Sequence, residues 1–335
     1  MNAPTHPEIS ILMVSYNTRE MTLAAIQSVV RETTVPFEII VIDNASTDGS
    51  AQAIAAHPGR VRLIARDDNI GFARANNLAA QYARADMLLL LNPDTIVKDK
   101  AIDRLLAFAR TNTHAGIWGG RTLFGNGSLN PSSCWRRITV WNTFCRTAGL
   151  AALFPNSPVF NAEKMGGWRR DTVRQVDIVS GCFFLIPKKL WHRLGGFDQA
   201  FYMYGEDADL CLRAHAIGAK PMVTPDATIV HYGGASEKNR AEKNIRLLAA
   251  KIMLIQRHVP AMKRPFARGF LRLWPLARLI ALSIAARFTH SQDQAENAAS
   301  WREVWKRRAE WQNGFPTPIA RTNDVATNNC KPVTT

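Results

Sequence analysis

The chain has 335 residues, of which 47% are hydrophobic, and a formal net charge of +15. This length and composition allow one large α/β domain with an appendage and exclude a chain that is disordered throughout. The five cysteines are odd in number and form no CxxC pair, so we expect no disulfide framework and a reducing, cytoplasmic environment. Neither a secretory signal pattern nor a run of about eighteen uncharged apolar residues is present, so we expect no membrane-spanning helix.

Apolar runs in the first hundred residues predict four buried β-strands, at 9–17, 37–44, 61–66 and 86–92. Amphipathic segments predict helices between and after these strands, at 19–31, 49–57, 71–84 and 99–111. Alternation of strands and helices predicts a parallel sheet with right-handed crossovers. Such sheets bind ligands beyond the carboxyl ends of their strands, and each of these strands ends in polar residues.

The second half of the chain is less regular. Residues 112–175 have weak periodicity and many Gly, Asn, Pro and Trp residues, which predicts loops with short strands. The pattern then predicts a strand pair at 176–187, helices at 188–198 and 205–218, a strand that ends at His231, and helices at 239–258 and 266–288. The tail from 313 is rich in Pro, Thr and Asn and predicts disorder.

The segment DNASTDGS, at 43–50, follows the second predicted strand. A carboxylate at that strand end, such as Asp43, can accept the N3–H of a uracil or thymine ring. The alternative is helix capping, because Ser46 or Thr47 before a helix is ordinary capping chemistry. Both hold together if Asp43 binds a base while Thr47 or Asp48 caps the helix.

Four leucines precede Asn92-Pro93-Asp94-Thr95. In an extended segment, the side chains of Asn92 and Asp94 lie on the same face. Mg²⁺ and Mn²⁺ accompany diphosphates and prefer oxygen ligands, so this pair is a candidate metal site. The alternative is a plain turn, because Asn-Pro-Asp is also good turn chemistry.

Three carboxylates, Glu206, Asp207 and Asp209, stand within four positions. Crowded carboxylates raise at least one pKa among them, which suits a general base. The alternative is a solvated first helical turn, where acidic residues are normal. His231 closes a later strand, where a neutral imidazole can complete a metal shell, although a lone histidine is more often structural.

In this order and spacing, the segments resemble the family 2 glycosyltransferases of the GT-A fold, and within them a rhamnosyltransferase-like bacterial branch. The resemblance runs from about Ile9 to Gly234 and rests on VSYN, DNASTDGS, DNIGFARANN, LLLNPDT, GGFDQAFYMYGEDADLCLRAHAIG and the following His. It implies an α/β fold, with a Rossmann-like mixed sheet flanked by helices. We expect a catalytic domain at 1–236, a basic amphipathic helical extension at 237–312 and a disordered tail at 313–335.

The resemblance also implies roles for individual residues. Asp43 corresponds to the carboxylate that reads the base, Ser15 and Asn17 lie along the nucleotide, and Asn76 lies beside the donor. Asn92 and Asp94 occupy the ends of the DxD motif, with Asp94 as the metal ligand and His231 completing the metal site. Asp207 corresponds to the catalytic base, with Glu206 and Asp209 as alternatives. Because Asn92 replaces the first acidic residue of DxD, we expect Asp94 and His231 to carry more of the metal binding.

The implied reaction moves a sugar from a nucleotide-diphosphate donor to a hydroxyl acceptor with inversion. Mg²⁺ or Mn²⁺ neutralises the leaving diphosphate, and the base faces the anomeric carbon from the opposite side. The branch implies dTDP-rhamnose as the donor. A polyprenyl-diphosphate-linked saccharide, used in cell-surface polysaccharide assembly, suits the basic end of the chain as the acceptor.

Residues 238–287 hold twelve Lys and Arg residues and one acidic residue, a net charge of +11. On a helical wheel, one side collects Phe266, Phe270, Leu273, Ala277, Ile280, Ile284 and Phe288, and the other collects Arg264, Arg268, Arg272, Arg278 and Arg287. This pattern predicts an interfacial helix on anionic lipid at the inner face of the cell membrane, with Pro275 breaking it in two. The alternative is a helix that packs on the catalytic domain and has a solvated basic face.

Two other classes of function explain less of the sequence. A nucleic-acid-binding protein would account for the basic charge, but the carboxylates at the strand ends would repel phosphates. A nicotinamide-dependent oxidoreductase would need GxGxxG after the first strand, where this chain has SYNTRE. We therefore expect an enzyme without a nucleic-acid partner.

Overall fold

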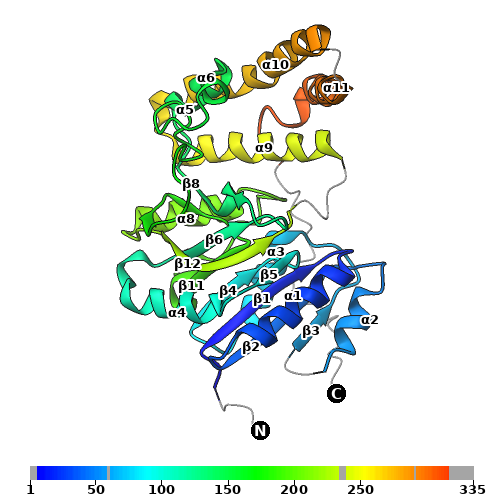
Figure 1. Ribbon diagram of the computed structural model, residues 1–335, viewed down its shortest axis with the longest axis vertical. Coiled ribbons are helices and arrows are strands. Elements are labelled where there is room, and N and C mark those ends of the chain that lie inside the picture. The colour runs from blue at the N-terminus through cyan, green and yellow to red at the C-terminus, as the bar shows by residue number, and fades with distance from the viewer. Residues whose placement is uncertain (1–5, 59–60, 234–238, 290–291, 317–335) are drawn as a thin grey trace.

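The computed structural model describes residues 6–58, 61–233, 239–289 and 292–316. Its centre is a mixed sheet with the strand order β3-β2-β1-β4-β11-β6-β12-β5 (Figure 1). These strands are β1 (Ile9–Ser15), β2 (Phe37–Asp43), β3 (Val61–Ala65), β4 (Met87–Leu91), β5 (Thr95–Val97), β6 (Trp118–Leu123), β11 (Phe183–Pro187) and β12 (Met222–His231). Short strands extend it: β7 (Leu129–Asn130) pairs with β6 and β9 (Arg174–Gln175) with β12, while β8 (Cys134–Trp135) and β10 (Ile178–Val179) pair separately.

The N-terminal half of the sheet is parallel, as the sequence predicts. Strands β1 and β2 are buried along their whole length, and alternate residues enter two different cores: Leu12 belongs to one, Ile11 to the other. Burial on both faces explains why these strands read as continuous apolar runs. The connecting helices α1 (Arg19–Glu32), α2 (Ser50–Ala55), α3 (Phe72–Tyr82) and α4 (Ala101–Thr111) match the predicted segments.

The other half of the sheet has mixed strand directions. Strand β11 is antiparallel to β4 and β6, while β12 is parallel to β6 and antiparallel to β5. The pairing of β12 with β5 aligns His231 with Thr95, although 136 residues separate them in the sequence. The wholly parallel sheet suggested by the first hundred residues is therefore wrong for the complete sheet, and the mixed sheet implied by the resemblance is confirmed.

The irregular segment at 112–175 contains two helices that the sequence analysis did not predict. They are α5 (Val140–Thr147) and α6 (Leu150–Leu153). Helix α5 has a capping box, in which the side chains of Thr139 and Asn142 bond each other's backbone N–H groups. Both helices span too few turns for apolar periodicity to reveal them. The capping residues Thr139 and Asn142 were the sequence signal from which α5 could be predicted.

Three long helices form the C-terminal extension: α9 (Arg240–His258), α10 (Arg264–Thr289) and α11 (Gln292–Lys306). Helix α9 lies between the sheet and a layer made of α5, α6, α10 and α11 (Figure 1). One buried apolar cluster runs from Leu12 in the sheet through Ile252 in α9 to Trp301 in α11. The extension therefore packs on the catalytic region. The proposed boundary at 236/237 and residues 317–335 of the predicted tail lie outside the described residues.

Helix α10 runs through Pro275 without a break, which contradicts the prediction of two helices. Proline removes one helical hydrogen bond, and packing compensates here. Pro275 is buried, Trp274 contacts Trp301 of α11 with ring centroids 5.0 Å apart, and the Thr147 hydroxyl of α5 donates to the Phe270 carbonyl at 2.7 Å.

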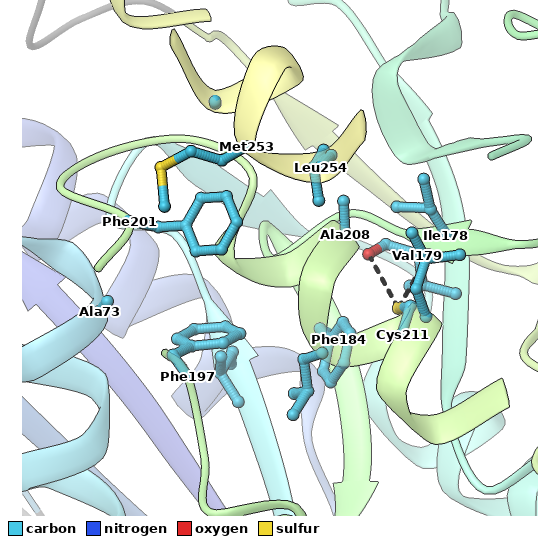
Figure 2. Close-up of a cluster of buried hydrophobic side chains, with 14 of the residues drawn as sticks. Ala73, Ile178, Val179, Phe184, Phe197, Phe201, Ala208, Cys211, Met253 and Leu254 are labelled. Atoms are coloured by element: carbon cyan, nitrogen blue, oxygen red, sulfur yellow. Dashed lines mark hydrogen bonds between the residues drawn. The ribbon is translucent and has the colours of Figure 1, made fainter. Parts of the chain in front are cut away.

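Helix α8 (Glu206–Ala216), which carries the acidic cluster, begins inside a packed apolar cluster (Figure 2). Met253 and Leu254 of α9 lie on one side of it, near Phe201 and Ala208. On the other side, Cys211 accepts a hydrogen bond from the Val179 amide at 3.4 Å. These contacts fix the first turn of α8 relative to the sheet. The described cysteines, Cys134, Cys145, Cys182 and Cys211, are free thiols.

Candidate active site

A cavity of about 880 Å³ lies beyond the carboxyl ends of β1, β2 and β4. Three groups of predicted site residues line this cavity. The segment after β4 contributes Asn92 and Asp94, β12 contributes His231, and the start of α8 contributes Glu206 and Asp207. The fold therefore brings together chemistry that the sequence distributes over more than a hundred residues.

Asp94 and His231 meet because β5 pairs with β12. The Tyr232 amide donates to the Asp94 carbonyl at 3.1 Å, and the Asp94 Oδ1 lies 3.3 Å from the His231 Nε2. Burial would lower the pKa of His231, but Cys182 and Asp94 outweigh it and raise that pKa to about 10. The imidazole is therefore protonated at neutral pH, so a metal bound at this nitrogen has to displace a proton.

The same place offers further ligand atoms. The Asn92 amide Nδ2 lies 3.5 Å from the His231 Nε2, and its buried Oδ1 has no hydrogen-bond partner among the described residues. No group of three or more His, Cys, Asp or Glu side chains suited to a metal occurs in the described part of the chain. A carboxylate, an imidazole and an amide oxygen fit a divalent cation whose remaining ligands are diphosphate oxygens.

Asp207 and Glu206 are two carboxylates in the first turn of α8. The Asp207 Oδ2 accepts a hydrogen bond from the Gly181 amide at 2.9 Å, while the buried Oε2 of Glu206 has no partner in the described part of the chain. Burial raises the pKa of Asp207 despite its backbone donors. Burial and the charge of Asp207 raise the pKa of Glu206 to about 8. Asp207 is therefore held by the backbone in a setting that favours proton acceptance.

Asp209 lies outside this cavity, which corrects its place among the candidate catalytic residues. It is buried in an ion-pair network, with His258 at 2.8 Å, Arg213 at 2.7 Å and Arg257 at 3.4 Å. Burial alone would raise its pKa, but His258 and Arg213 outweigh it and lower that pKa. The network ties α8 to α9, so Asp209 has the environment of a structural residue.

Asp43 lies just behind the cavity wall. It is buried, its Oδ1 accepts from the Ser46 amide at 3.0 Å, and its Oδ2 has no partner among the described residues. The adjacent Asn44 lines the cavity and donates to the Asn69 Oδ1 at 2.8 Å. A buried carboxylate oxygen that lacks a donor is suited to receive one from a ligand.

Among the predicted donor residues, Asn92 lines the cavity, while Ser15, Asn17 and Asn76, like Asp43, do not. The Ser15 hydroxyl lies 3.1 Å from that of Thr22, Asn17 accepts from the Thr47 amide at 2.8 Å, and Asn76 donates to the Phe72 carbonyl at 3.0 Å. These bonds organise the loops and α3, so the side chains of Ser15, Asn17 and Asn76 are engaged within the protein, and their place along the donor stays a prediction.

Residues 10–176 match the family Glycosyl transferase family 2. The chain belongs to this family. The glycosyltransferase is 28% identical over 211 residues to N-acetylglucosaminyl-diphospho-decaprenol L-rhamnosyltransferase of Mycobacterium tuberculosis, covering 59% of this chain and 67% of the relative. It is 32% identical over 259 residues to the succinoglycan biosynthesis protein ExoO of Rhizobium meliloti, covering 75% and 69%.

A solved structure supports the fold. The mannosyltransferase PcManGT from Pyrobaculum calidifontis, in complex with GDP-Man and Mn²⁺, matches with a TM-score of 0.58 and 16% sequence identity. The match covers 92% of this chain and 88% of that one. The GT-A-like fold predicted from the motifs is confirmed.

Sequence reasoning missed several residues that line the cavity of the glycosyltransferase. Tyr16 and Asn69 lie within the motifs VSYN and DNIGF, where the signal was available. The cations on α5 and α9 lie outside every motif. Only the packing of α9 on α8 and of α5 on α10 places them at the site.

Proposed function

We propose that this enzyme transfers a sugar from a nucleotide-diphosphate donor to an acceptor hydroxyl with inversion, and that Asp207 is the general base. The observation that carries the proposal is one cavity lined by the Asp94–His231 pair and by the half-buried Asp207. A leaving diphosphate needs positive charge and an acceptor proton needs a base, and the cavity offers both.

Asp207 takes the proton of the acceptor hydroxyl as that oxygen attacks the anomeric carbon. The Gly181 amide holds one carboxylate oxygen at 2.9 Å, which orients the side chain without neutralising it. The bond to the diphosphate breaks on the opposite face of the sugar. A single displacement of this kind inverts the anomeric centre.

Asp94, Asn92 and His231 would hold Mg²⁺ or Mn²⁺. Such an ion supplies positive charge to the leaving diphosphate. Asp43 would accept the N3–H of the uracil or thymine base through its Oδ2, which has no partner among the described residues. That contact would restrict the donor to nucleotides that carry this donor group.

The relatives guide the choice of substrates. We propose dTDP-rhamnose as the first donor to test and a polyprenyl-diphosphate-linked saccharide as the acceptor, in polysaccharide assembly, because the mycobacterial relative is named for such a reaction. A donor-hydrolysis screen over UDP-, dTDP- and GDP-sugars tests the donor. Hydrolysis confined to GDP-sugars would contradict the role of Asp43.

We also propose that the enzyme binds the inner face of the cell membrane through its C-terminal layer. Helix α10 packs inward through Ala267, Leu271 and Pro275, yet a second apolar row faces outward. Side chains exposed on α10 and on the neighbouring α5–α6 segment are Phe266, Leu273, Ile280, Ile284, Phe288, Trp141, Phe144, Leu153, Phe154 and Val159. The two sets join where the Phe144 and Phe270 rings lie 5.3 Å apart. A continuous exposed apolar surface marks an interaction site.

The charges around this surface favour a lipid interface. Lys263, Arg278 and Arg287 are exposed, whereas Arg264 and Arg272 donate to the carbonyls of Val259 and Gln312, so part of the predicted basic face is structural. Residues 261–289 form a helix that is long and apolar enough to span a membrane. It was not predicted from the sequence, because that prediction required a run of uncharged residues. We favour a surface-bound helix, because α10 packs on α5, α9 and α11.

A further inference from the structure

The side of the cavity formed by α9 is rich in cations. Lys243, Arg246 and Lys251 line it from one face of the helix. At a rise of about 1.5 Å per residue, Lys243 and Lys251 are roughly 12 Å apart along α9. Arg136, Arg146 and Lys164 extend this surface from the segment around α5. We call these six residues the cationic wall.

The deep end of the cationic wall is organised around one carboxylate. Glu163 is buried and pairs with Arg146 at 2.5 Å and with Lys251. Burial would raise the pKa of Glu163, but Arg146 and Lys251 outweigh it and lower that pKa to about 2. Glu163 is therefore ionised, and it holds the two cations in place from behind.

One carboxylate does not neutralise the surrounding cations. Lys164 follows Glu163 directly and also lines the cavity. Burial lowers the pKa of Lys251, and the positive charge of Arg146 lowers it further, against the opposite effect of Glu163. Like charges held close together in a cavity are stabilised by a bound anion.

The cationic wall spans the space between the catalytic base and the proposed membrane face. At one end, Arg246 lies over the Tyr202 ring at 5.6 Å, in the loop that leads into α8. At the other end, Arg146 lies over the Trp274 ring of α10 at 5.0 Å. The cationic wall therefore extends from the loop before α8 to α10.

We propose that the cationic wall binds the diphosphate of a prenyl-diphosphate-linked acceptor and so positions the acceptor sugar at Asp207. This inference rests on the proposed function. A donor diphosphate would be attracted to the same cations as an acceptor diphosphate. In the proposed function, however, the donor diphosphate binds at the sheet edge, beside Asp94, His231 and Asn92. Arg146 and Lys251 belong instead to α5 and α9, and α9 lies between the sheet and the layer that contains α5 and α10 (Figure 1).

Calorimetry with the full-length protein tests the site. Farnesyl diphosphate, titrated with EDTA present so that metal-dependent sites are silent, should bind at least about tenfold more tightly than farnesol. Lys251→Gln should weaken farnesyl diphosphate binding about tenfold, and Lys164→Gln should weaken it less. Lys164 is exposed, so its variant should keep the wild-type melting temperature. Arg302→Gln, which removes an exposed cation that does not line the cavity, is the matched control.

Binding of dTDP with Mn²⁺, measured on the same variants, separates the two sources of diphosphate. It should stay at the wild-type level. The inference is overturned if both lysine variants bind farnesyl diphosphate normally, if farnesol binds equally well, or if dTDP–Mn²⁺ affinity falls in parallel. Wild-type protein that binds farnesyl diphosphate but no nucleotide would support this site and overturn the proposed function instead.

Discussion

The cavity has two sides that differ in charge and in origin. The side at the sheet edge carries Asp94, Glu206 and Asp207, placed by strand ends and by the start of α8. The cationic wall comes from α9, which lies between the sheet and the layer that contains α10, and from the segment around α5. One side suits a divalent cation and a proton, and the other suits an anion. Under the proposed function, donor activation and acceptor positioning are therefore the work of different parts of the fold.

The two sides also differ in how their residues are supported. Asp207 lies in the first turn of α8, a helix that packs on β10 and α9, and a backbone amide orients it. Arg146 and Lys251 are oriented by a buried countercharge, Glu163. Loss of one residue should therefore affect turnover or donor binding on the first side and acceptor binding on the second.

The largest effect is expected at the base. Asp207→Asn should lower turnover by roughly a hundredfold or more, because the acceptor proton loses its receiver, while nucleotide binding is kept. Initial rates and dTDP titration measure the two quantities. Asp209→Asn is the control two residues away: it should lower stability by breaking its buried ion pairs, but leave turnover per folded molecule near normal. Near-normal turnover in Asp207→Asn would reassign the base to Glu206.

The metal site should show the next largest effect. Asp94→Ala should weaken Mn²⁺-dependent dTDP binding more than about tenfold, and His231→Ala should weaken it less, because a carboxylate is the stronger ligand for a hard ion. Calorimetry with Mn²⁺ and with EDTA gives both affinities. Wild-type affinity that is independent of the metal would show that these residues have another role.

The exposed row of α10 tests the membrane proposal. Ile280 and Ile284 are 52% and 53% exposed, one turn apart, so their replacement by serine should not disturb the core. The double variant should bind phosphatidylglycerol vesicles about tenfold more weakly, because two apolar side chains no longer insert.

Co-sedimentation in low and high salt measures this binding, and salt should weaken it in both proteins. Ile217→Ser, at an exposed isoleucine that follows α8, is the control and should bind like the wild type. Equal binding by the Ile280/Ile284 variant would assign the apolar row to another partner.

The smallest effect concerns stability. Burial and the charge of Asp207 raise the pKa of Glu206 from 4.5 to about 8, so the folded protein keeps a proton that the unfolded chain releases. Stability should therefore fall as pH rises through this window. Glu206→Gln should remove much of that slope and stabilise the fold by about 1 kcal/mol at the alkaline end. Urea unfolding at about pH 6 and about pH 8 measures it, with the exposed Glu303→Gln as control. An unchanged slope would mean that Glu206 gains a partner in solution.

The sequence by itself was enough for the parallel half of the sheet and for the family. Continuous apolar runs follow from burial on both faces, and polar residues at the ends of β2 and β4 mark the binding edge, so both signals are local. The motifs around Asp43, Asp94, Asp207 and His231 led to the same family that the comparisons show.

Only the tertiary structure decided which polar residues reach the cavity. Asp207 and Asp209 are the same residue type in the same acidic cluster, so the sequence does not distinguish them. In the structure, Asp209 bonds with His258, which is 49 residues away in the sequence, and does not line the cavity. The same holds for α10, whose helical wheel has one clear apolar side, while the helix buries a different stripe and exposes that side. Periodicity determines which residues share a face of a helix. What covers that face depends on contacts between segments that are distant in the chain.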